Sequence, residues 1–308
     1  MPRLFLFMSM FIFCACQKSQ EVIFETLYSD PAVSWKSIAK DDNLLYVAGG
    51  NQWEGGLIMV SDQSVNSWDI ELQSATGFLE IDRFQSSIFA AGFNSNFVQK
   101  RNAIWEDKSI MQSSIIRGVA QNEQALIAVG GQAYFEGYVY RASTDGSFTT
   151  RDTLDAEVSD VVYVNGSIFI AVGYGSVYRS EDNGVSWNRL NVQGDFFRKI
   201  QFVNENLGFI VGIAGKVLRT EDSGMTWQEI KKGQGAFGGI DQMRSIYFED
   251  ESRGLIVGDQ GNIQMTEDGG DSWTTIEGLP EEDYNDVFLL ENLAIVLSEQ
   301  GNIFRFDL

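Results

Sequence analysis

The chain has 308 residues, of which 43 are acidic and 22 basic, so its formal net charge is −21 at pH 7. This excess of negative charge argues against nucleic acid or an anionic membrane surface as a broad binding partner. The sequence has no histidine, and both of its cysteines lie within the first sixteen residues. The remainder therefore excludes disulfides, Cys/His zinc sites and Ser-His-Asp or Cys-His nucleophile pairs.

Residues 1–16 are typical of an export signal that is removed from the mature protein. Their apolar run, residues 4–13, is shorter than the ~20 residues that a membrane-spanning helix needs. The segment FCAC (13–16) resembles a lipobox, except that its first cysteine replaces a small hydroxyl or aliphatic residue. We expect cleavage before Cys16 and lipidation of its thiol; an ordinary cleaved signal is the alternative. Gln17, in place of a retention-type Asp, favours the outer membrane of a bacterial envelope.

A repeat dominates the rest of the chain. It has three strong copies, whose sequences are given at the end of this paragraph, and weaker copies that begin at residues 56, 101, 137 and 301. An apolar run and an alternating segment precede each copy, and a short alternating segment follows each tryptophan, which gives four strands in ~40 residues. Three segments align without gaps, namely GSVYRSEDNGVSW (175–187), GKVLRTEDSGMTW (215–227) and GNIQMTEDGGDSW (261–273).

Seven such units fit between Trp35 and the C-terminus. Four-stranded units of this length predict an all-β fold, a seven-bladed β-propeller of antiparallel blades that forms one domain over residues 17–308. The last unit lacks a fourth strand, and the unclaimed segment VIFETL (22–27) has the matching pattern. We expect this N-terminal strand to complete the last blade and close the ring, which leaves no long exposed edge.

The aligned copies share the pattern Ser/Thr-x-Asp-x-Gly-x-x-Trp, which resembles the Asp-box, or BNR repeat, of sialidase-like propellers. We interpret it as a turn between the third and fourth strands, in which Asp accepts backbone N–H groups and Gly adopts a positive φ. The tryptophan would cover the apolar edge of the blade. Carboxylates that hold calcium are the functional alternative. The pattern comprises Ser180, Asp182, Gly184, Trp187, Thr220, Asp222, Gly224, Trp227, Thr266, Asp268, Gly270 and Trp273.

The layout as a whole is most similar to the propellers of the photosystem II stability and assembly factors and their bacterial relatives. The segment GFIVGIAGKVLRTEDSGMTWQEI (208–230) carries this resemblance best. The resemblance implies a binding or assembly scaffold without catalytic activity. A lipid-anchored, acidic chain departs from the photosynthetic type of that family.

A binding site is expected on the face where each inner strand begins, over the central channel. Four of the seven equivalent entry positions are basic, which suits a carboxylate, a phosphate or an acidic peptide. The alternative is that each basic residue pairs with a nearby acid, such as Asp160, Asp241 or Asp286. The entry positions are Lys36, Leu79, Arg117, Ser159, Arg198, Arg244 and Asn285.

The loops on this face also carry aromatic residues, which suit stacking against a peptide or a glycan. The alternative is that their rings fold inward and fill the loops. The candidates are Trp53, Tyr134, Phe135, Tyr174, Phe196, Phe197 and Phe237.

Two functions follow from these patterns. The first is a monomeric, lipid-anchored propeller that binds another envelope protein, an acidic peptide or a glycan, without a cofactor or a metal. The second is a glycoside hydrolase of the sialidase-like type, for which two carboxyls would have to face each other near the channel. Against the hydrolase, no Arg-Ile-Pro signature occurs and the blade count is seven rather than six. The candidate carboxyls are Asp160, Asp241, Asp259 and Asp286.

Overall fold

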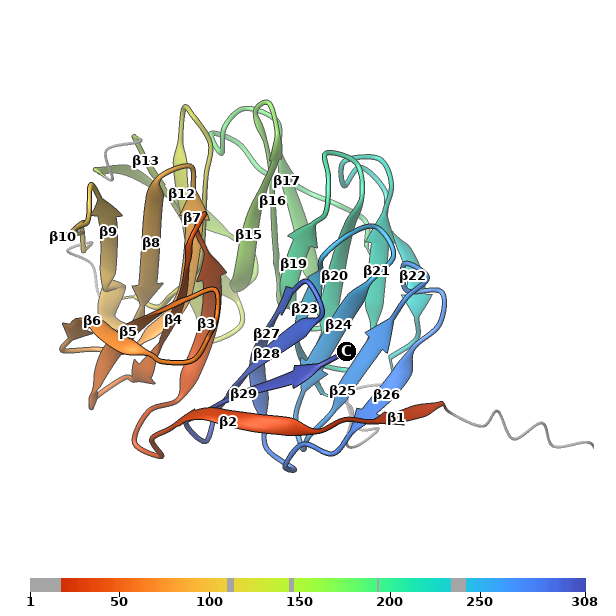
Figure 1. The fold of residues 1–308 in the computed structure, drawn as a ribbon. Coiled ribbons are helices and arrows are strands. Elements are labelled where there is room, and N and C mark those ends of the chain that lie inside the picture. The colour runs from red at the N-terminus through yellow and green to blue at the C-terminus, as the bar shows by residue number, and fades with distance from the viewer. Residues whose placement is uncertain (1–17, 110–113, 144–146, 193, 234–241) are drawn as a thin grey trace, which may run out of the picture.

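The computed structural model describes residues 18–109, 114–143, 147–192, 194–233 and 242–308. They form seven sheets around one axis, each built on four antiparallel strands, with the first strand of each blade innermost (Figure 1). This confirms the predicted seven-bladed propeller. Within the described ranges, no helix is long and apolar enough to cross a membrane.

The blades follow one another along the chain. Blade 1 contains β3 (Trp35–Lys40), β4 (Leu44–Asn51), β5 (Gly55–Asp62) and β6 (Asp69–Ser74). Blade 2 contains β7 (Phe78–Phe84), β8 (Ser87–Gly92), a 3-10 turn η1 (Phe93–Ser95), β9 (Phe97–Arg101) and β10 (Ile104–Asp107). Blade 3 contains β11 (Ile116–Gln121), β12 (Leu126–Gln132), β13 (Glu136–Ala142) and β14 (Phe148–Leu154).

Blades 4 to 6 carry the best copies of the repeat. Blade 4 contains β15 (Val158–Asn165), β16 (Ile168–Gly173), β17 (Ser176–Ser180) and β18 (Asn188–Arg189). Blade 5 contains β19 (Phe197–Phe202), β20 (Gly208–Gly212), β21 (Val217–Thr220) and β22 (Gln228–Lys231). Blade 6 contains β23 (Met243–Phe248), β24 (Gly254–Gly258), β25 (Ile263–Thr266) and β26 (Thr274–Glu277).

Blade 7 joins the two ends of the described chain. It contains β27 (Tyr284–Leu290), β28 (Leu293–Ser298) and β29 (Asn302–Asp307), and β2 (Phe24–Ser29) pairs antiparallel to β29 at its outer edge. The predicted closure by the N-terminal strand is therefore confirmed, with β2 beginning two residues later than expected. A preceding strand, β1 (Ser19–Glu21), pairs parallel to β26 of blade 6, which the repeat pattern did not predict.

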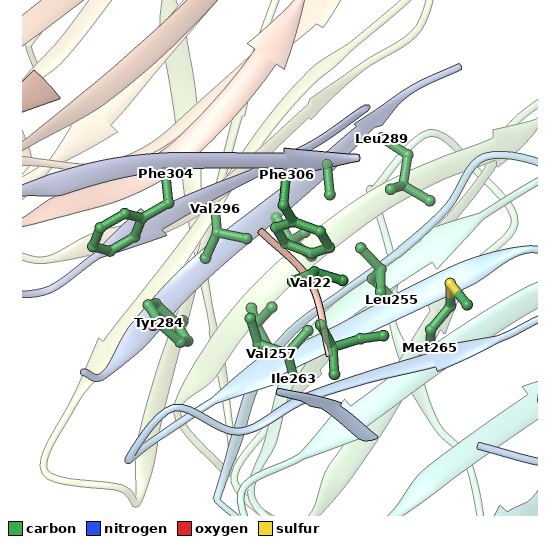
Figure 2. Close-up of a cluster of buried hydrophobic side chains, with 13 residues drawn as sticks. Val22, Leu255, Val257, Ile263, Met265, Tyr284, Leu289, Val296, Phe304 and Phe306 are labelled. Carbon is green, nitrogen blue, oxygen red and sulfur yellow. The ribbon is translucent and has the colours of Figure 1, made fainter. Parts of the chain in front are cut away.

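Apolar side chains fill the spaces between neighbouring blades. The second strands are mostly apolar; β20 and β24, for example, are buried along their whole length. Figure 2 shows the cluster between blades 6 and 7, in which Leu255 and Val257 of blade 6 face Phe304 and Phe306 of blade 7. Val22, from the link between β1 and β2, is buried in the same cluster and fastens the closing segment to both blades.

The Asp-box turns have the hydrogen bonds that the sequence predicts. In blade 4, Ser180 Oγ donates to Asp182 Oδ1 at 2.8 Å, and the amide of Ser186 donates to the same oxygen at 2.8 Å. Gly184 has φ +74°, and a Cβ there would lie 2.3 Å from Cδ1 of Ile127 in blade 3. The turns at Thr220 and Thr266 repeat these bonds. The motif therefore shapes the turn and lets adjacent blades pack closely.

Candidate functional site

Every inner strand begins with the same irregularity. The register against the second strand shifts at one residue, which forms a β-bulge. The residue inserted at the bulge is in each blade the entry position aligned from the sequence, so the seven positions are structurally equivalent. The inserted residues are Lys36, Leu79, Arg117, Ser159, Arg198, Arg244 and Asn285.

The bulge determines which side chains face the channel. In blade 5, Phe197 and Ile200 are 0% and 3% exposed, while Arg198 and Lys199 between them line the channel. Phe197 is therefore a core residue, and its prediction as a binding residue was wrong. The residue before each bulge anchors the blade in the core, because the inserted residue reverses the usual alternation of a strand.

All seven entry residues line one hollow of about 540 Å³, which we call the mouth. Since the second and third strands of each blade join on this face, the Asp-box turns, which join the third and fourth strands, lie at the opposite end of the blades. The structure thus brings Lys36, Arg117, Arg198 and Arg244 together and keeps the repeated turn away from them.

On one side of the mouth the basic residues are paired. Lys36 Nζ lies 2.5 Å and Arg244 Nη1 3.2 Å from Oε2 of Glu299, and Asn285 Nδ2 donates to the same oxygen at 2.7 Å. Arg244 also pairs with Asp259 and Asp283. Burial alone would raise the pKa of Glu299, but Lys36 and these hydrogen bonds outweigh it and lower the pKa to about 2.

The other side of the mouth holds Arg117 and Arg198. Arg117 Nε lies 2.7 Å from Oε1 of Glu157. Arg198 is exposed, and no carboxylate of the described residues forms an ion pair with it. Partial desolvation, followed by the charges of Arg244 and Arg117, lowers the pKa of Arg198, which reflects the crowding of positive charge in this hollow.

The alternative of local pairing thus holds for three of the four basic residues, although with different acids from those expected. Asp160 Oδ2 accepts the amide of Ile200 at 3.0 Å and lies 3.8 Å from Lys199 Nζ. Asp286 Oδ2 accepts the amide of Ile38 at 3.0 Å. Asp241 lies outside the described residues.

A lysine and a glutamate meet across the channel beneath the mouth. Lys199 Nζ of blade 5 lies 2.8 Å from Oε1 of Glu80 in blade 2. Burial raises the pKa of Glu80, and the charge of Lys199 lowers it. The nearby carboxylates of Asp160 and Asp286 offset much of the effect of Lys199, so the pKa of Glu80 is raised to about 8. Burial also raises the pKa of Asp160. This bridge forms the floor of the mouth, and sequence analysis missed it because Lys199 and Glu80 are 119 residues apart.

The predicted aromatic residues fall into different surroundings. Tyr134 and Phe135 are 58% and 75% exposed and lie beside Tyr174, which is half-buried. Trp53 is 79% exposed on the corresponding loop of blade 1. Phe196, rather than Phe197, accompanies the first three rings. Phe237 and Cys16 lie outside the described residues.

The carboxyls proposed for a hydrolase are engaged in other contacts where they are described. Asp160 and Asp286 accept backbone amides in the channel, and Asp259 pairs with Arg244. The described ranges contain no group of three or more Asp, Glu, His or Cys residues arranged to hold a metal ion.

Comparison with known families agrees with the repeat. Residues 51–221, more than half of the chain, match the family model described as photosynthesis system II assembly factor YCF48. The chain belongs to this family. A comparison with curated protein sequences gave no significant match.

Solved structures share the fold at low sequence identity. A structure of YCF48 bound to D1 peptide is 11% identical, with a TM-score of 0.69 over 95% of this chain and 99% of that chain. YCF48 from Cyanidioschyzon merolae is 11% identical, with a TM-score of 0.67 over 92% and 98%. The WD40 propeller domain of Doa1 is also 11% identical, with a TM-score of 0.68 over 92% and 97%. Likeness at this identity extends to the fold alone.

Proposed function

We propose that this propeller is a non-catalytic scaffold that binds or helps to assemble a protein partner, and that a carboxylate of the partner contacts Arg198 in the mouth. One observation carries the proposal. Four basic entry residues converge on the mouth, and Arg198 alone among them lacks a carboxylate partner in the described residues. Membership of an assembly-factor family and the solved complex of YCF48 with a peptide support a protein partner.

The charge distribution supports an acidic partner group. The guanidinium of an arginine can hold a carboxylate through two parallel hydrogen bonds, which gives both strength and orientation. The chain as a whole is strongly acidic, so its net charge repels a negatively charged ligand at long range, and a cation without an acidic partner offers such a ligand a local point of attachment. Arg198 therefore concentrates binding of an anionic group at one point of the surface.

We also propose that Cys16 carries a lipid and anchors the propeller to the bacterial outer membrane, so that the partner is another envelope protein. The support is the short apolar run before FCAC and the polar sequence that follows it. Expression of wild type and Cys16→Ser with labelled palmitate tests this. Label and membrane fractionation should both be lost in the variant, and an equally membrane-bound, unlabelled wild type would contradict the anchor.

The hydrolase has weaker support. Glu80 is one of the channel carboxyls with a raised pKa, as such chemistry needs, but Lys199 Nζ lies 2.8 Å from Oε1 of Glu80 and competes with a substrate for this carboxyl. Incubation with a panel of sialylated and other acidic oligosaccharides tests it. Release of a sugar that Glu80→Gln abolishes would favour the enzyme over the scaffold.

A matched pair of substitutions tests the scaffold. Arg198→Glu reverses the free charge in the mouth, while Arg189→Glu makes the same change on β18, where Arg189 Nη1 lies 2.6 Å from Asp155 Oδ2. Residues 17–308 of each variant are used to capture proteins from envelope extract. We expect Arg198→Glu to lose partners that wild type and Arg189→Glu both retain. Equal recovery by all three would refute the role of Arg198.

A further inference from the structure

Four aromatic rings from three blades form one continuous surface beside the mouth. Tyr134 and Phe135 come from the β12–β13 loop, Tyr174 from the β16–β17 loop, and Phe196 from the entry to β19. The centroids of Tyr174 and Phe196 are 3.9 Å apart, and Tyr134 lies 5.3 Å from Tyr174 and 6.1 Å from Phe196. We call these four residues the aromatic ridge; Figure 1 shows the first two loops next to each other at one end of the ring.

The ridge is held in place rather than collapsed onto the blades. Ala133 and Tyr134 have φ values of 56° and 67°, which are uncommon for residues other than glycine and costly for a large side chain. The amide of Tyr134 donates to Glu157 Oε2 at 3.0 Å, and its carbonyl accepts the amide of Glu157 at 3.1 Å. These contacts fix an exposed ring at the edge of the mouth.

The ridge is also connected to the mouth through charged residues. The second carboxylate oxygen of Glu157 pairs with Arg117 in the mouth. Phe196 and Arg198 flank the buried Phe197, so an apolar ring and a guanidinium that has no ion pair within the described ranges are two residues apart in the chain. Two residues of extended chain span about 7 Å and place their side chains on the same side.

We propose that the aromatic ridge and Arg198 together bind an extended peptide in which an apolar side chain lies two residues from an Asp or Glu. The inference rests on the proposed function and specifies the partner's chemistry. An extended peptide has the same spacing as Phe196 and Arg198, so its apolar side chain packs on the ridge while its carboxylate reaches the guanidinium. Exposed aromatic rings with few rotatable bonds supply contact area at low entropic cost.

The test uses a random heptapeptide library displayed on phage and selected on residues 17–308. The double variant Tyr134→Asn, Phe135→Ser removes the exposed half of the ridge, and Asn tolerates the left-handed backbone of Tyr134. The matched control is Met225→Ser, which removes an exposed apolar side chain from the Asp-box turn at the opposite end of blade 5. Arg198→Gln removes the charge alone.

Wild type and Met225→Ser should enrich sequences with an aromatic or aliphatic residue two positions from an acid. The ridge double variant should keep the preference for acid, lose the apolar preference and bind a wild-type-selected peptide about tenfold more weakly in fluorescence polarisation. Arg198→Gln should keep the apolar preference and lose the preference for acid.

Acidic peptides without an apolar position, or an unchanged preference in the double variant, would overturn the ridge proposal and leave binding by Arg198 intact. If no peptide were enriched and an acidic oligosaccharide such as trigalacturonate bound instead, the ridge proposal and the proposed protein partner would both be overturned in favour of a glycan.

Discussion

Two arginines at equivalent positions of the mouth, Arg244 and Arg198, differ in their ion pairing. At blades 6, 7 and 1, Arg244 and Lys36 converge on Glu299 and form a network that the surrounding loops complete. At blades 3 to 5, Arg198 occupies the equivalent bulge without a described partner and stands beside exposed aromatic rings. The difference shows that a basic residue at the mouth is a binding candidate only when no carboxylate of the protein itself reaches it.

This comparison predicts different costs for two arginine substitutions. Arg244→Ala leaves Asp259, Asp283 and Glu299 without their shared cation, and we expect it to lower the free energy of unfolding by about 2 kcal/mol. Arg198→Ala removes no ion pair of the described residues and should change stability by less than about 0.5 kcal/mol. Urea unfolding of both variants measures this, and equal losses would contradict the distinction between the paired Arg244 and the free Arg198.

The pH dependence of stability separates the network from the channel floor. The pKa of Glu299 is lowered to about 2, so its contribution is present above the ordinary carboxyl pKa and is lost as pH falls from about 4.5 towards 2. The pKa of Glu80 is raised to about 8, so folding takes up a proton and stability falls as pH rises from about 4.5 to 8.

Each slope is at most about 1.4 kcal/mol per pH unit, the value for one proton. Urea unfolding between pH 3 and pH 8 should show a shallower acid limb for Glu299→Gln and a shallower neutral limb for Glu80→Gln, each with the other limb unchanged. If both variants kept the wild-type profile, neither carboxyl would control it.

The Asp-box turns should affect stability but not binding. Asp222→Ala removes the acceptor for Thr220 Oγ1 and for the amide of Thr226, and we expect a loss of about 1 kcal/mol. Because this turn lies at the opposite end of the blade from Arg198, peptide affinity should not change. A variant that folds with wild-type stability but no longer binds peptide would show that the turn belongs to a site.

The repeat was sufficient to predict the ring, because its glycines and tryptophans recur at fixed offsets and its apolar runs fill every space between blades. Alignment also identified the seven equivalent entry positions, although not the β-bulge at each of them. It could not show that Phe197 is buried and Phe196 half-exposed, since the bulge reverses the alternation that assigns strand faces. The acidic residues that pair with the basic residues of the mouth could not be predicted either, because Lys36 and Glu299 are 263 residues apart and meet only when the ring closes.

The central claim, that Arg198 is the available cation of the mouth, can be tested without knowing the partner. Phenylglyoxal reacts with arginine guanidinium groups, and peptide mapping by mass spectrometry gives the rate of modification at each site. Arg198 should react several-fold faster than Arg117 and Arg244, and a peptide selected on the wild-type protein should protect it. Equal rates at the three arginines, or an Arg198 that bound peptide does not protect, would contradict the account.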